Sequence, residues 1–82
     1  MKIQALRPDL LAFLKAHNLE KKWEKAAGLF EENLRHPSLH TELLEPGWRG
    51  IYSFRIDRKY RALFFMRQEG AEIFQVTKHY KK

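Results

Sequence analysis

The chain has 82 residues, a formal net charge of +6 and no cysteine. This length fits one domain, residues 1–82, because it is too short for two independent hydrophobic cores. The sequence also lacks a signal-peptide core and any apolar run near the ~20 residues of a membrane span, which together with the missing thiols predicts a soluble cytoplasmic protein.

The N-terminal part of the sequence predicts a strand followed by a helical hairpin. MKIQAL, residues 1–6, is a candidate strand, and Pro8 then suits the first turn of a helix. Apolar residues recur at helical spacing in PDLLAFLKAH and again after Asn18, which we predict to be the N-cap of a second helix. Because a residue before proline disfavours helical backbone, Pro37 should end this helix near residues 34–35. Its apolar stripe is Leu19, Trp23, Ala26, Ala27, Phe30 and Leu34.

After a connection rich in proline and glycine, HPSLHTELLEPGWRG, the apolar period changes to two. IYSFRID, KYRALFFM and AEIFQVT predict three strands, with RQEG as the turn between the last two. KYRALFFM is apolar on both faces, which suits a central strand. The predicted order is β-α-α-β-β-β, an α+β fold in which a helical hairpin packs on a small, mostly antiparallel sheet.

Positive charge is concentrated in the C-terminal half of the chain. Residues 1–34 contain six basic and five acidic side chains, whereas from Trp48 onward basic residues far outnumber the acids. Such a field attracts polyanions and would make nucleic-acid binding depend on salt. Simple solubility is the alternative explanation.

Four of these cations lie within IYSFRIDRKYR, interleaved with aromatic residues. Arg55, Arg58 and Lys59 could pair with phosphates while rings stack on bases, or they could form only the solvated tip of a hairpin. Arg61 lies in an apolar strand, where a charge needs a partner or a water-lined cleft. A two-residue loop would place Arg55 and Arg61 on opposite faces, and a three-residue loop on the same face.

The histidines of the sequence suit different roles. His36 and His40 are four residues apart, but Pro37 between them argues against a helical metal pair, and we expect no metal site. His17, on the inner edge of the first helix, should pack or cap. His79 follows a predicted strand, and it is either a general acid suited to neutral pH or an ordinary surface histidine.

The segment FEENLRHPSLHTELLEPGWRGIYSFRIDRKYRALFF, followed by IFQVTKHY, resembles the RelE/ParE superfamily of bacterial toxins from type II toxin–antitoxin modules. The most specific features are HPSLHTELLEP, the hairpin G-I-Y-S-F-R-I-x-x-x-Y-R and the terminal HY. The His–Tyr pair is most similar to the YoeB-like branch, whose members are mRNA endoribonucleases acting at the ribosome. The resemblance covers nearly the whole chain.

This resemblance implies a metal-independent mRNA interferase without cofactors that inhibits translation. Glu42 would be the general base, Arg61 the arginine that stabilises the phosphate, and His79 the general acid. Tyr80 would orient RNA or stack on it, and Glu45 is an alternative base. The residues expected to contact RNA are Arg55, Arg58, Lys59, Lys78, Lys81 and Lys82.

The resemblance also implies a cognate antitoxin, with a disordered acidic or amphipathic segment, as a partner beside mRNA and the ribosome. The helical hairpin could serve as a homodimer interface. Other interpretations stay open, because Glu42 could simply pair with Arg35 or Arg49. Members nearer ParE keep the fold but act on DNA gyrase, so a non-nucleolytic toxin is the alternative function and an inactive RNA-binding module a third.

Overall fold

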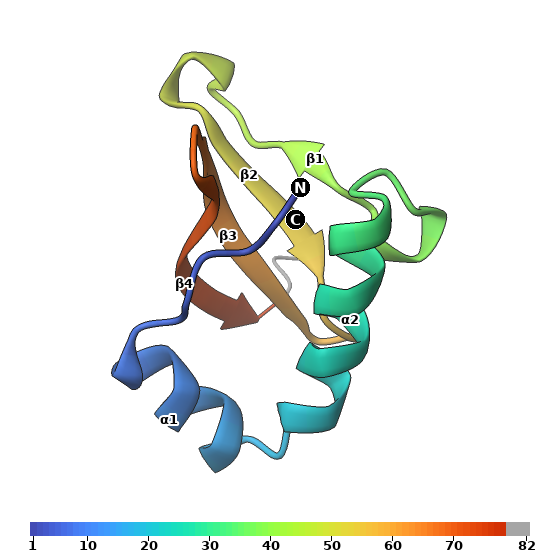
Figure 1. Cartoon of the computed structure of the whole chain (residues 1–82), viewed down its shortest axis with the longest axis vertical. Helices are drawn as coiled ribbons and strands as arrows, with labels where there is room; N and C mark the ends of the chain where they lie inside the picture. Colours follow the sequence, from blue (N-terminus) through green and yellow to red (C-terminus); the bar gives the residue numbers. More distant parts are fainter. Residues whose placement is uncertain (79–82) are drawn as a thin grey trace.

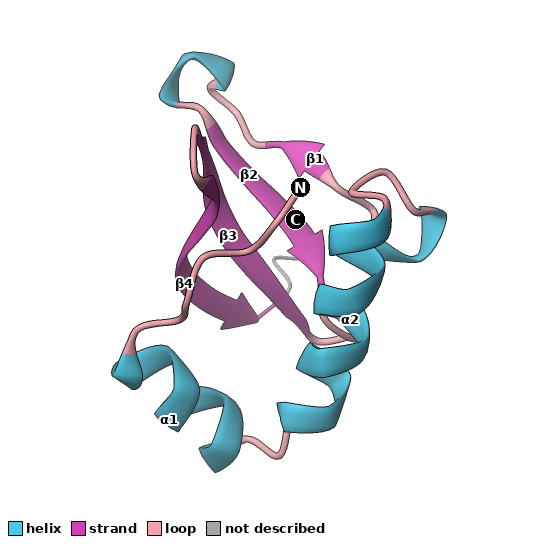
Figure 2. Ribbon diagram, viewed as in Figure 1, coloured by secondary structure: helices cyan, strands magenta, loops and turns pink. Residues whose placement is uncertain are grey.

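The computed structural model describes residues 1–78, and in this part of the chain it contains two α-helices and a four-stranded antiparallel sheet (Figures 1 and 2). The fold is therefore of the α+β class that the sequence predicts. None of the helices within these residues is long and apolar enough to cross a membrane. The elements are α1 (Pro8–Ala16), α2 (Glu20–Glu32), η1 (Pro37–Leu39), β1 (Glu42–Leu43), η2 (Gly47–Arg49), β2 (Ile51–Arg55), β3 (Tyr60–Arg67) and β4 (Gly70–Lys78), where η denotes a 3₁₀-helix.

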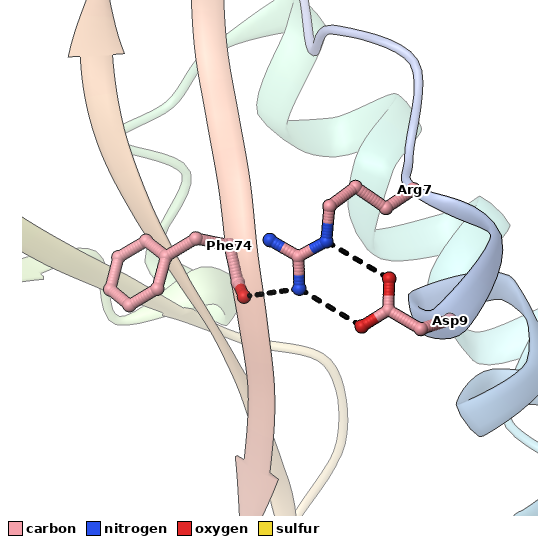
Figure 3. A network of polar contacts seen from close by, with 3 residues as sticks. All are labelled: Arg7, Asp9 and Phe74. Carbon is pink, nitrogen blue, oxygen red and sulfur yellow. Dashed lines mark hydrogen bonds and ion pairs between the residues drawn. The ribbon is translucent and has the colours of Figure 1, made fainter.

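Helix α1 begins at Pro8, as predicted, and its start is attached to the sheet through Arg7. The Arg7 guanidinium donates hydrogen bonds to both carboxylate oxygens of Asp9, at 2.9 and 3.0 Å, and its Nη2 also donates to the carbonyl oxygen of Phe74 in β4 (Figure 3). The hydrogen bond between the two side chains raises the pKa of Arg7 and lowers that of Asp9. One side chain therefore links the first turn of α1 to a distant strand.

The junction between the helices differs from the prediction, because Asn18 ends α1 and does not cap α2. Its backbone is left-handed, with φ of 56°, a conformation that asparagine tolerates. The N–H of Asn18 donates to the carbonyl of Lys15 and that of Leu19 to the carbonyl of Leu14, which is the Schellman pattern of a helix C-terminus. Leu14 and Leu19, at the two positions where an apolar contact accompanies this motif, are both buried and belong to the same core cluster. Helix α2 then starts at Glu20 without a side-chain cap and ends at Glu32, slightly before the predicted end.

The first expected strand is wrong, so the order β-α-α-β-β-β needs correction. Residues 1–6 form only a single parallel bridge, between Ile3 and Ala71 beside β4, because only Lys2 to Gln4 come within hydrogen-bond distance of that strand. The fourth strand of the sheet is instead β1, which lies before β2 in the segment that the sequence predicts to be a connection. Two residues are too few to show a period of two, so the sequence pattern does not reveal this strand.

The sheet has the order β1-β2-β3-β4, and its two faces differ. On the core face, Phe30 of α2 stacks on Phe54 and meets Phe64 edge-on, with ring centroids 4.8 and 5.1 Å apart. Because side chains alternate along a strand, the intervening residues point to the other side. We call this side the arginine face. Its residues in β1, β2 and β3 are Glu42, Ile51, Ser53, Arg55, Arg61, Leu63, Phe65 and Arg67.

The register of the β2–β3 hairpin decides between the two loop lengths considered above. Arg55 and Arg61 are direct cross-strand partners, and the N–H of Ile56 donates to the carbonyl of Tyr60. The turn therefore consists of residues 57–59. A three-residue turn places the two arginines on the same face of the sheet.

Candidate functional site

Arg61 is the centre of the candidate site because its charge is buried within the sheet. Only 6% of the residue is exposed. Its Nε donates a hydrogen bond to the Oγ of Ser53 at 3.0 Å, and its Nη2 donates to the carbonyl oxygen of His40 at 2.7 Å. The expectation that a cation in this apolar strand needs partners is thus confirmed. Both acceptors are neutral, so they orient the guanidinium without cancelling its charge.

Glu42 supplies a carboxylate beside this cation. It lies in β1 opposite Ser53, and its Oε1 is 3.7 Å from Nη2 of Arg61. The Glu42 side chain is 59% exposed, so its carboxylate remains accessible from solvent. Within residues 1–78 it forms no ion pair with Arg35 or Arg49, the alternative partners suggested by the sequence.

The alternative base, Glu45, stands apart from this pair. It follows β1 and precedes η2, and in the described part of the chain its carboxylate forms no ion pair with Arg61. Of the two glutamates in the motif TELLEP, Glu42 is therefore the one that lies on the arginine face next to the buried cation.

The electrostatics of the site favour an added anion. Burial lowers the pKa of Arg61, the Glu42 carboxylate opposes this effect, and the neighbouring Arg55 guanidinium adds to it. An arginine side chain nevertheless stays protonated near neutral pH. A desolvated cation with one solvent-exposed carboxylate at 3.7 Å and a second cation nearby is incompletely neutralised, which suits a phosphate group.

A groove of about 550 Å³ lies between α2, η1 and the β2–β3 turn. We call it the basic groove. Its apolar lining consists of Ala26, Leu29, Leu39 and Ile56, and its basic lining of Lys22, Lys25, Arg55, Arg58 and Lys59. Arg55 belongs to both features, since it lines the groove and also acts on the pKa of Arg61. Arg61 itself does not line the groove, so Arg55 is the residue that connects the groove with the buried cation.

Some predicted RNA contacts meet in this region and others do not. Arg55, Arg58 and Lys59 line the groove together. Lys78 instead lies opposite Tyr60 at the end of β4, at a position whose side chain belongs to the core face of the sheet. Sequence reasoning missed Lys22 and Lys25. Their spacing of three residues, which places both on one side of α2, was the available signal.

The remaining predicted site residues, His79, Tyr80, Lys81 and Lys82, lie outside the described residues. The roles that the resemblance implies for them therefore stay predictions. They concern the general acid, the RNA-orienting ring and two phosphate contacts.

The other histidines have local structural roles. The Nδ1 of His17 is 2.9 Å from the carbonyl of Phe13, and the two rings stack with centroids 4.0 Å apart, so His17 both caps and packs. The Nδ1 of His36 accepts a hydrogen bond from the N–H of Ser38 at the start of η1. His40 has a left-handed backbone and offers its carbonyl to Arg61. Within residues 1–78 there is no group of three or more acidic or histidine side chains that could hold a metal ion.

Comparison with protein-family models and with curated proteins gives no match for this chain. The function proposed below therefore rests on the side-chain geometry and on the sequence motifs quoted above.

Proposed function

We propose that this chain is the toxin of a type II toxin–antitoxin module, related to the RelE/ParE superfamily and nearest to its YoeB-like branch. In this proposal it is an endoribonuclease that cleaves mRNA at the ribosome and thereby inhibits translation. The α+β fold, with a helical hairpin on an antiparallel sheet, is compatible with such a toxin.

One observation carries the proposal: Arg61 is buried and oriented by neutral acceptors, with the exposed carboxylate of Glu42 3.7 Å away. A fixed, desolvated guanidinium can stabilise charge that develops on phosphate oxygens. A solvent-accessible carboxylate can accept a proton from a bound hydroxyl. The two groups thus provide an electrostatic stabiliser and a base within one small region.

The chemistry that follows is an internal transesterification of RNA. Glu42 takes the proton of a ribose 2′-OH, and the 2′-oxygen forms a new bond to the adjacent phosphorus. Arg61 stabilises the negative charge on the phosphate oxygens while the bond to the 5′-oxygen breaks. A general acid protonates that 5′-oxygen, the role that the resemblance implies for His79. The products are a 2′,3′-cyclic phosphate and a 5′-hydroxyl, and DNA cannot react because it lacks the 2′-OH.

A protein partner belongs to the same proposal. The basic groove combines apolar lining residues with four cations outside the Lys22–Asp57 ion pair. An acidic segment with apolar side chains, such as a disordered antitoxin tail, complements both properties. Binding there would also cover Arg55, beside the buried cation.

The test is primer-extension mapping of mRNA in a translating system with purified protein. Wild type should produce cuts within translated codons, and Glu42→Gln should reduce cutting by roughly 10²–10⁴-fold, since it removes the base. Glu45→Gln is the matched control, because it neutralises a carboxylate three residues away, and it should cut like wild type. His79→Ala in the same assay tests the implied general acid.

Each outcome has a consequence for the assignment. Loss of cutting in Glu45→Gln but not in Glu42→Gln would move the base and contradict the geometry proposed here. A folded wild-type protein that makes no cuts would rule out the ribonuclease. Toxicity that persists in Glu42→Gln would then favour a non-nucleolytic toxin with a protein target.

A further inference from the structure

Three side chains form a partly exposed stack at the other end of the arginine face. The rings of Phe65 and Phe74 are nearly parallel, with centroids 4.6 Å apart and an interplanar angle of 24°. The guanidinium carbon of Arg67 lies 4.7 Å from the centroid of Phe65, and its Nε donates to Glu72 at 2.8 Å. We call Phe65, Phe74 and Arg67 the aromatic stack.

An irregularity in the sheet creates this arrangement. Leu63 pairs with Gln75 and Phe64 with Ile73, so Phe74 is an extra residue without a cross-strand partner. Such a bulge re-aims a side chain. The ring of Phe74 lies on the side of β4 away from Arg7 and α1, while its carbonyl oxygen accepts the hydrogen bond from Arg7 (Figure 3). The hydrogen bond from Arg7 thus contacts the backbone of the bulge on the side opposite to the ring.

The stack does not serve the hydrophobic core. Neither Phe65 nor Phe74 belongs to the core cluster or packs against it, and both rings remain partly exposed. Partly exposed aromatic rings beside a cation are the groups that stack on the bases of single-stranded nucleic acids, and this contact tolerates any base. An aromatic pair on neighbouring strands of a sheet is also a common platform for RNA bases.

The position of the stack relative to Arg61 fits one RNA strand. Arg61 and Phe65 lie on the same face of β3, four residues apart, which corresponds to ~13 Å along the strand. Leu63 is the one residue of this face between them. A single strand whose scissile phosphate lies at Arg61 can therefore run along β3 and bring a neighbouring base to the stack.

We propose that the aromatic stack is a base-binding subsite for single-stranded RNA, separate from the reacting phosphate. This inference rests on the proposed function, because the position of the scissile phosphate at Arg61 determines which base of the RNA reaches the stack. A polyanion suits this face better than an apolar protein surface, since its three arginines, Arg55, Arg61 and Arg67, outnumber the two glutamates Glu42 and Glu72, and the chain carries a net charge of +6.

The experiment uses a single-stranded RNA oligonucleotide that cannot be cut, because the nucleotide at the mapped cleavage site lacks its 2′-OH. The fluorescent base 2-aminopurine is placed at successive positions, and its quenching on protein binding reports stacking. Quenching should be greatest at one position away from the scissile nucleotide. It should be retained in Phe74→Tyr and lost in Phe74→Leu, which keeps an apolar side chain but removes the ring.

A second variant avoids the danger that a change at Phe74 disturbs the bulge. Arg67→Gln alters an exposed side chain, and it should weaken binding of the oligonucleotide by about five-fold, as expected for loss of part of a stacking site. Lys21→Gln removes the same charge from the surface of α2 and should leave both affinity and quenching unchanged.

The outcomes separate this inference from the ribonuclease. If wild type cuts mRNA in the translating system but quenching is uniform along the oligonucleotide, or unchanged in Phe74→Leu, the subsite is wrong and the ribonuclease stands. Position-specific quenching without any cuts in the translating system would support the subsite and remove the enzyme. An oligonucleotide that does not bind would contradict the subsite and leave the ribonuclease to the translating assay.

Discussion

At the scale of single residues, Ser53 shows how the site is held. Ser53 is a polar residue between two aromatic residues of β2, yet it is fully buried. Its Oγ is satisfied there because it accepts the hydrogen bond from Nε of Arg61. A buried cation is costly unless it keeps such partners. Ser53 is thus a positioning residue for Arg61.

This contact predicts a coupling that can be measured. Ser53→Ala should lower the free energy of unfolding by about 1–3 kcal/mol, since it leaves a buried donor without its acceptor. In the background of Arg61→Leu, where no guanidinium is left without its acceptor, the same change should cost much less. Urea denaturation of the four proteins completes the cycle. Equal costs of Ser53→Ala in both backgrounds would show that the hydrogen bond does not stabilise the fold.

At the scale of elements, Asp57 connects the β2–β3 turn to α2. Its Oδ1 accepts hydrogen bonds from the N–H groups of Lys59 and Tyr60, and its Oδ2 pairs with Nζ of Lys22 at 3.1 Å. Burial alone would raise the pKa of Asp57, but the two backbone donors and the ammonium outweigh it, so the pKa lies below its ordinary value. The ionised form therefore stabilises the turn that carries part of the basic groove.

The sign of this shift predicts a pH dependence. Because the folded pKa is below the unfolded value of 3.8, the stabilisation is fully present above that value and is lost as the pH falls through the folded pKa. Asp57→Asn should therefore be less stable than wild type by about 1 kcal/mol at neutral pH. The difference should disappear in strong acid, as followed by urea denaturation at several pH values. A difference that persists in acid would mean that charge is not its source.

At the scale of the whole molecule, folding gathers cations that are dispersed in the sequence. Lys22 and Lys25 come from α2, whereas Arg55, Arg58 and Lys59 come from the end of β2 and the turn. The N-terminal region has almost balanced charge in sequence, yet it contributes to the positive side of the folded protein. For polyanion binding, the position of a charged side chain in the folded protein thus matters more than its contribution to the net charge.

Salt dependence of RNA binding can test this statement. For the uncleavable oligonucleotide, Arg55→Gln should reduce the slope of log affinity against log salt by about 0.7, the value for one lost phosphate contact with a single strand. Lys21→Gln lowers the net charge equally but lies outside the groove, so its slope should match wild type. The same reduction in both variants would show that only the total charge matters.

Much of the secondary structure and part of the site follow from the sequence. Helices α1 and α2 and strands β2, β3 and β4 come from local periodicity, which each segment carries within itself. The need of Arg61 for partners is equally local, because a charge in an apolar strand is costly anywhere. These predictions required no knowledge of distant contacts.

The sequence by itself determined the class of the fold, the types of most elements and the excess of positive charge, because these depend on neighbouring residues. Only the tertiary structure decided which side chains meet. The approach of Glu42 to Arg61, the burial of Ser53 and the bulge at Phe74 all depend on strand register. Register is set by pairing between segments far apart in the chain, and a shift of one residue moves every side chain to the other face.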